Sequence, residues 1–147
     1  MKAIRRALAL VTAGALTFLL AAPAMAAAPP TTYHGVFDGP VAFRGCTPAA
    51  PVDTADGQWN VIIRGDMATV AFNIFVNGRH HVSFGGVAPI VAARPGETFA
   101  VSILTGAGPL RVSLAGTRFM YDITPYDFSP WGGLKCDGGV TYYGTLQ

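Results

Sequence analysis

The chain has 147 residues, of which 51% are hydrophobic and 12% are charged, and its formal net charge is +2. Three of the ten basic residues precede residue 27, so the remaining chain carries seven basic and eight acidic residues and a net charge of −1. A nucleic-acid surface needs clustered cations that displace counterions from phosphates. The seven basic residues are spread singly along the chain, so we expect no nucleic-acid partner.

Residues 1–26 are predicted to be an export signal peptide. Lys2, Arg5 and Arg6 precede an apolar run that is shorter than the roughly 20 residues of a membrane span, and Ala24–Ala26 has the small-x-small pattern of a cleavage site. We therefore expect a secreted, extracellular protein that begins near Ala27 and has no membrane contact after cleavage. The style of this signal and the scarcity of Lys favour a bacterial source with a high-GC genome.

The rest of the chain is predicted to be a flexible lead over residues 27–32 and one all-β domain over residues 33–147. Alternating or β-branched runs are separated by segments rich in Gly, Pro and Asp, and no run of about ten residues has a capped helical period. The expected strands are about eight: 33–44 (bent at Gly39 and Pro40), 58–64, 67–76, 79–84, 98–104, 110–115, 118–124 and 140–146.

The connections between these strands are short, which predicts antiparallel neighbours. Eight such strands fit a closed or partly closed β-barrel, with a two-sheet β-sandwich as the alternative. Tyr33–Val36 and Tyr143–Leu146 have patterns that would let the first and last strands pair. Because such closure removes exposed strand edges, the barrel is favoured.

The two cysteines, Cys46 and Cys136, are predicted to form a disulfide, as is usual in an exported protein. Closing a loop of this length stabilises the fold by about 4 to 5 kcal/mol in the chain-entropy account. No metal site or cofactor is expected. His80 and His81 are adjacent in a strand and point to opposite faces, and His34 is distant in sequence.

Two turns, Gly65-Asp66 and Asn77-Gly78, determine which side chains share a face if each is a two-residue hairpin loop. One face of the first two strands is then apolar, which predicts a core made by Trp59, Val61, Ile63, Ala68, Val70, Phe72, Ile74 and Val76. In the third strand this register places Arg79, His81 and Ser83 on the core side, and Val82 and Phe84 on the other.

An imidazole and a hydroxyl against an apolar wall suggest a ligand site inside the barrel. Binding sites are mostly apolar with a few convergent polar groups, and the mouth of a small barrel often holds one. The residues that we expect to bind a small ligand are His81, Ser83, Phe72, Ile74 and Tyr121. The alternative is that this strand lies at a rim or edge where its face is wet.

Residues 125–133 form a long aromatic loop just before Cys136. Its Tyr126, Phe128 and Trp131 either plug the end of the barrel or present a surface to a partner, because aromatic side chains supply large contact areas at small entropic cost. The partner in the second case is an extracellular protein or a carbohydrate.

The sequence therefore predicts a secreted binding module for a small ligand or a surface partner. One alternative is an acid–base enzyme that uses His81 with Ser83 or Tyr121, although no nucleophile motif is present and we name no catalytic residue. A further alternative is a secreted inhibitor or interaction protein that uses the loop from Tyr126 to Trp131. Neither the ligand nor an oligomeric state follows from the sequence.

Overall fold

The structure is a computed structural model in which residues 27–147 are described; the predicted export signal, residues 1–26, lies outside them. The described part contains ten strands and one short 3-10 helix, and no helix in it is long and apolar enough to cross a membrane. The elements are β1 (Thr31–Pro40), β2 (Ala42–Thr47), β3 (Thr54–Arg64), β4 (Met67–Val76), β5 (Arg79–Pro89), β6 (Glu97–Thr105), β7 (Gly108–Ala115), β8 (Arg118–Ile123), β9 (Tyr126–Asp127), η1 (Ser129–Trp131) and β10 (Lys135–Leu146).

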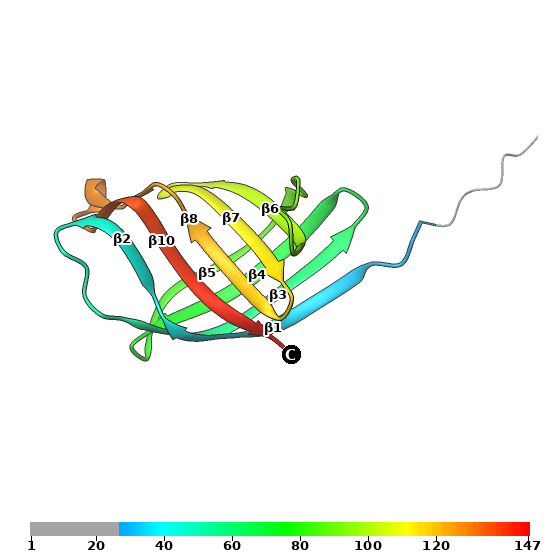
Figure 1. The fold of residues 1–147 in the computed structure, drawn as a ribbon, viewed down its shortest axis with the longest axis horizontal. Coiled ribbons are helices and arrows are strands. Elements are labelled where there is room, and N and C mark those ends of the chain that lie inside the picture. Colours follow the sequence, from blue (N-terminus) through cyan, green and yellow to red (C-terminus); the bar gives the residue numbers. More distant parts are fainter. Residues whose placement is uncertain (1–26) are drawn as a thin grey trace, which may run out of the picture.

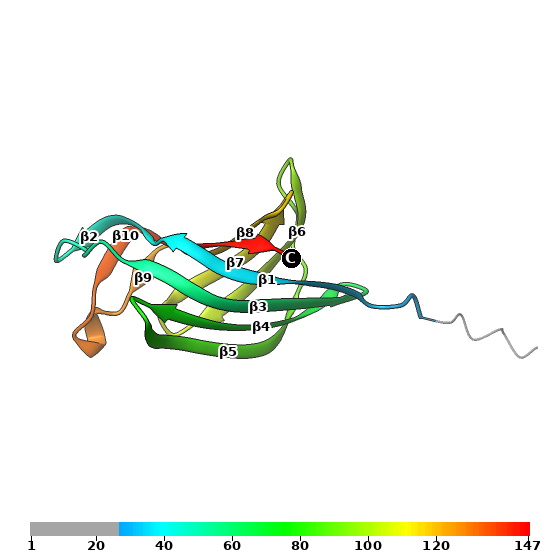
Figure 2. The same ribbon diagram turned by 90° about the horizontal axis from the view of Figure 1, so that it is seen from below.

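Eight antiparallel strands form a nearly closed barrel, in the order β5-β4-β3-β1-β10-β8-β7-β6. The first and last strands pair as predicted, with Val36 opposite Thr145. Figure 1 shows the strands crossing the barrel obliquely, and Figure 2 shows β3, β4 and β5 side by side along one wall. The two ends of the path, β5 and β6, form no ladder in the described structure; just after β5, Ile90 forms an isolated bridge with Val101, and the Val91 N–H donates to the Ala100 carbonyl.

Both predicted hairpin turns are present. Arg64 pairs with Met67 across the first turn and Val76 with Arg79 across the second, and Asn77 adopts the left-handed φ of 51° that such a turn requires. The predicted apolar face is the interior wall: Trp59, Val61, Ala68, Val70, Phe72 and Ile74 are buried, and Ile63 and Val76 are half-buried against the same core.

The predicted face of β5 is wrong beyond its first two residues because of a β-bulge. Phe75 pairs with His80, but the next residue of β4, Ile74, pairs with Val82, so His81 is an extra residue in β5. A shift of one residue exchanges the two faces of a strand. Val82 and Phe84 therefore pack against the core, and Ser83 lies on the outer surface opposite Asn73.

Some strand limits also differ from those predicted. The segment that was expected to be one bent strand is divided at Val41 into β1 and β2, and β9 was not predicted. Gly85 and Gly86, expected to end a strand, lie inside β5. Glycine is permitted but not obliged to form a turn, and neighbouring strands decide the outcome here.

The interior contains a compact group of aromatic rings around Trp59. Its indole stacks on Phe119 at 4.0 Å between ring centroids, and its Nε1 donates a hydrogen bond to the Val36 carbonyl. Gly35 and Gly144 lie against the same indole, and a Cβ on Gly35 would be 2.6 Å from it. These two glycines therefore give the large ring the space that it occupies.

The predicted disulfide is present. Cys46 of β2 faces Cys136 of β10 in the same antiparallel pair, and their sulfur atoms are 2.02 Å apart. The bond joins β2 to the barrel strand β10, and β9 pairs with the same part of β10. The aromatic loop is therefore held at the end of the barrel next to the disulfide.

Candidate functional site

A cleft of about 500 Å³ opens at one end of the barrel, where η1 and the β4–β5 turn lie at the same end of the long axis (Figures 1 and 2). Its walls come from β5, β8 and β10, from the β6–β7 turn and from the aromatic loop. The lining residues are His81, Val82, Phe84, Thr105, Gly106, Ala107, Tyr121, Ile123, Tyr126, Phe128 and Tyr142. None of these side chains carries a carboxylate, an ammonium or a guanidinium group.

The β-bulge at His81 gives the cleft its β5 wall. Because the register shifts there, Val82 and Phe84 turn to the inside of the barrel. Phe84 stacks on the buried ring of Phe72 at 5.1 Å, and Phe72 contacts Tyr121 edge-to-face at 4.7 Å. The cleft wall is thus continuous with the aromatic core, which holds it rigidly.

The opposite wall consists of phenol rings. Tyr121 and Tyr142, on neighbouring strands, pack edge-to-face at 5.4 Å. Tyr126 and Phe128, from the aromatic loop, stack at 5.9 Å and complete the rim. Burial raises the pKa of Tyr121, Tyr142 and Tyr126, so the three hydroxyls are protonated at neutral pH and available as hydrogen-bond donors.

One polar pair lies in this apolar setting. The His81 Nε2 and the Tyr142 hydroxyl oxygen are 3.0 Å apart, so the two groups share a hydrogen bond whose direction depends on the imidazole tautomer. His81 as a whole is exposed at the rim, while its ring lies partly inside the protein. Burial lowers the pKa of His81, and the nearby Asp53 carboxylate only partly opposes this. The imidazole is therefore favoured in its neutral form.

The structure brings some of the predicted ligand residues together and separates others. His81 and Tyr121 line the cleft, whereas Phe72 and Ile74 are buried core residues that do not line it. Ser83 is wrongly placed by the prediction: its hydroxyl donates to Asn73 Oδ1 on the outer surface.

The residues of the predicted partner loop lie at the same end of the barrel. Tyr126 and Phe128 line the cleft, and Trp131 is the last residue of η1. The loop therefore shares one site with the ligand residues instead of forming a second one. Phe128 remains 41% exposed, which places it at the outer rim.

The enzymatic alternative that pairs His81 with Ser83 requires both residues to lie in one site, but His81 lines the cleft and Ser83 lies on the outer surface. Ser83 instead contacts the neighbouring histidine, with 2.8 Å between its Oγ and His80 Nε2. A serine nucleophile needs a base that is itself held by a third group. The hydrogen bonds of the described chain give His80 no carboxylate partner, and the Ser83 hydroxyl is directed to Asn73.

Sequence reasoning missed Tyr142, Val82 and Phe84. Tyr142 lies in the part of β10 that was predicted, residues 140–146, and its alternation with Val140 indicates an inward position. The two β5 residues were missed because the bulge follows from packing across three strands and leaves no local mark in the sequence.

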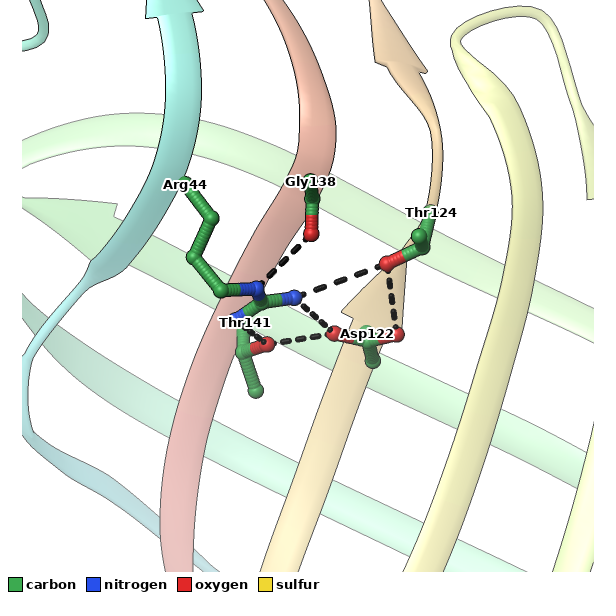
Figure 3. Close-up of polar contacts among 5 residues, drawn as sticks. All are labelled: Arg44, Asp122, Thr124, Gly138 and Thr141. Atoms are coloured by element: carbon green, nitrogen blue, oxygen red, sulfur yellow. Dashed lines mark hydrogen bonds and ion pairs between the residues drawn. The ribbon is translucent and has the colours of Figure 1, made fainter.

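A polar cluster on another wall has a structural explanation. The Arg44 guanidinium donates from Nε to the Gly138 carbonyl at 2.7 Å and from one terminal nitrogen to Asp122 at 2.8 Å (Figure 3). Its other terminal nitrogen donates to Thr141, whose hydroxyl in turn donates to Asp122. Arg44 thus ties β2 to β8 and β10, and its donors are already engaged.

In residues 27–147 no group of three or more His, Cys, Asp or Glu side chains is arranged to hold a metal ion. Comparisons with protein families, with curated proteins and with solved structures find no match to this chain.

Proposed function

We propose that the protein is a binding module that holds a small, largely apolar ligand in the cleft at the end of its barrel. The observation that carries this proposal is the combination of an aromatic cleft of about 500 Å³ with one convergent polar pair, His81 and Tyr142. Ligand sites in proteins have this composition, in which the apolar wall provides affinity and a few polar groups fix orientation.

The chemistry of the lining narrows the ligand class. A charged ligand group would lose its hydration without gaining an oppositely charged partner, because no lining side chain is charged at neutral pH when His81 is neutral. A flat aromatic or aliphatic group with one hydroxyl, carbonyl or ring nitrogen fits better. The apolar part would contact Phe84, Tyr121 and Ile123, and the polar atom would meet the His81–Tyr142 pair.

We also propose that the protein acts outside the cell after export. The disulfide supports this, because disulfides persist in oxidising compartments and are rare in the cytosol. The sequence of residues 1–26 supports it independently.

Binding accounts for the cleft better than catalysis does. An acid–base enzyme would need a His81 that readily becomes charged, but the hydrogen bond of His81 in the described structure is to the neutral Tyr142 hydroxyl, and the nearby Asp53 carboxylate only partly offsets the effect of burial on its pKa. The neutral pair is suited to recognising a hydrogen-bonding atom.

The proposal is tested by titrating the oxidised protein with N-phenylnaphthylamine, an uncharged fluorophore that brightens in apolar sites. Saturable binding is expected. Ala107→Trp, which places a large ring in the cleft, is expected to weaken binding by about tenfold or more. Ala93→Trp is the control, because Ala93 is exposed in the β5–β6 connection. Non-saturable binding, or equal binding by both variants, would contradict the proposal.

A further inference from the structure

The strand β5 has one edge that the barrel leaves open. β5 pairs with β4 along its length except at the bulged His81. On its other side, the backbone contacts with β6 in the described structure come just after the end of β5, at the Ile90–Val101 bridge and at the Val91 N–H, which donates to the Ala100 carbonyl at 2.9 Å. For residues 79–88 the described structure contains no backbone ladder on the β6 side. Backbone donors and acceptors there are available to another extended chain.

The central part of this edge, residues 82–88, lacks the usual protection against pairing. Natural edge strands carry charged residues, prolines or bulges that discourage a second strand. Residues 82–88 contain neither a charged residue nor a proline. The bulge at His81 and the ring of Pro89 lie at the two ends of this stretch and leave its centre unobstructed.

Exposed apolar side chains flank the same opening. Val87 on β5 is 65% exposed and Leu104 on β6 is 87% exposed. The Ile90–Val101 bridge is antiparallel, so the residue three positions before Ile90 corresponds to the residue three positions after Val101. This register places Val87 opposite Leu104. They point away from the barrel, whereas Val82 and Phe84 of the same edge point into the cleft.

We infer that the ligand of the cleft is an extended peptide that adds a strand to β5. This inference rests on the proposed function and names its ligand class. Successive side chains of a strand point to opposite faces. One set enters the aromatic cleft beside Phe84, and the other set covers Val87 and Leu104 on the outside. A compact small molecule would contact only the cleft, and it would not account for the exposed apolar side chains of Val87 and Leu104.

The peptide has a defined chemistry. Main-chain hydrogen bonds to β5 supply affinity without regard to sequence, and the cleft selects the side chains that enter it. Because the lining is uncharged, those side chains are apolar or aromatic. The unprotected stretch 82–88 accommodates a strand of about five to seven residues, the common strand length in proteins.

The test is selection of linear peptides of about seven residues from a displayed random library on the oxidised full-length protein. Peptides with alternating apolar residues are expected to be enriched. A resynthesised peptide should slow hydrogen exchange of β5 amides, and methylation of its backbone nitrogens on the β5 side should weaken binding by about tenfold or more.

Three lysine variants give a matched comparison. Val87→Lys and Leu104→Lys are each expected to weaken peptide binding by about tenfold, whereas Val52→Lys is the control, since Val52 is 95% exposed and lies outside the opening. Absence of enrichment, full binding by the methylated peptide, or equal effects of all three variants would overturn the inference. Protection of β5 amides that depends on protein concentration without peptide would also overturn it, because a second copy would then occupy the edge.

The outcomes separate this inference from the proposed function. If N-phenylnaphthylamine binds the cleft and no peptide does, the peptide inference fails and the small-ligand function stands. If neither binds, both fail.

Discussion

The hydrogen bond between His81 and Tyr142 is the polar centre of the proposed site, and its contribution can be measured with a double-mutant cycle. The variants are His81→Ala, Tyr142→Phe and the two combined. The bond joins a hydroxyl on a residue that is 3% exposed to an imidazole at the rim. A net hydrogen bond contributes about 0.5 to 1.5 kcal/mol, and water reaches the imidazole side, so we expect a coupling free energy near 1 kcal/mol.

The assay is urea unfolding at pH 8, followed by tryptophan fluorescence, to which Trp59 contributes from its stacked position in the core. Tyr142→Phe keeps the ring and its packing, so its loss of unfolding free energy should be about 1 kcal/mol in wild type and nearly zero when His81 is already Ala. Additive effects within about 0.3 kcal/mol would show that the two groups are not coupled and would refute the reasoning.

Four further predictions follow from single features of the structure. Burial lowers the pKa of His81, so the folded state binds its proton less readily than the unfolded state. The unfolding free energy of wild type should therefore fall as pH decreases through about 6.5. The fall should be steeper than in His81→Ala, which retains the other histidines. Urea unfolding measured across this pH range tests the prediction. Replacing both disulfide cysteines by Ala should lower the unfolding free energy by up to about 4 to 5 kcal/mol, measured by urea unfolding. Gly35→Ala should destabilise by more than about 2 kcal/mol, because its Cβ would lie 2.0 Å from a backbone oxygen, whereas Gly85→Ala, whose Cβ meets nothing within 4 Å, should be neutral or slightly stabilising in a thermal melt. Arg44→Met should lower the unfolding free energy by about 1 to 2 kcal/mol in urea unfolding, and the loss should be somewhat smaller in 1 M salt because the Arg44–Asp122 ion pair is partly exposed; an unchanged unfolding free energy would contradict the role of Arg44 in joining the strands.

The overall architecture could be predicted from local signals. The hairpin turn Gly65-Asp66 predicted the register of β3 with β4 along both strands, because a two-residue loop allows only one pairing. The turn Asn77-Gly78 predicted the pairing of β4 with β5 only as far as the bulge at His81. The alternation in the later strands located their inner faces, and the pairing of the chain ends followed from the same pattern. The cysteine count predicted the disulfide.

The site was predicted less well, for a physical reason. A bulge adds one residue to β5 and exchanges its faces, and the shifted register brings Phe84 onto Phe72 in the core. No short-range signal in the sequence encodes that contact. The prediction nevertheless placed His81 at the cleft, because His81 is the extra residue at which the register changes. Ser83 comes after the change and therefore lies on the outer surface.

The location of binding is tested most directly by nuclear magnetic resonance of the isotope-labelled, oxidised protein during titration with N-phenylnaphthylamine. The largest chemical-shift changes are predicted at Val82, Tyr121, Tyr126 and Tyr142, which line the cleft and not the outer depression. A second depression of about 560 Å³ lies on the outer surface, and its lining includes the polar residues Gln58, Asn60 and Asn73, which are absent from the cleft and provide the internal comparison. Changes confined to that outer depression, or spread evenly over the barrel, would contradict the assignment of the cleft as the ligand site.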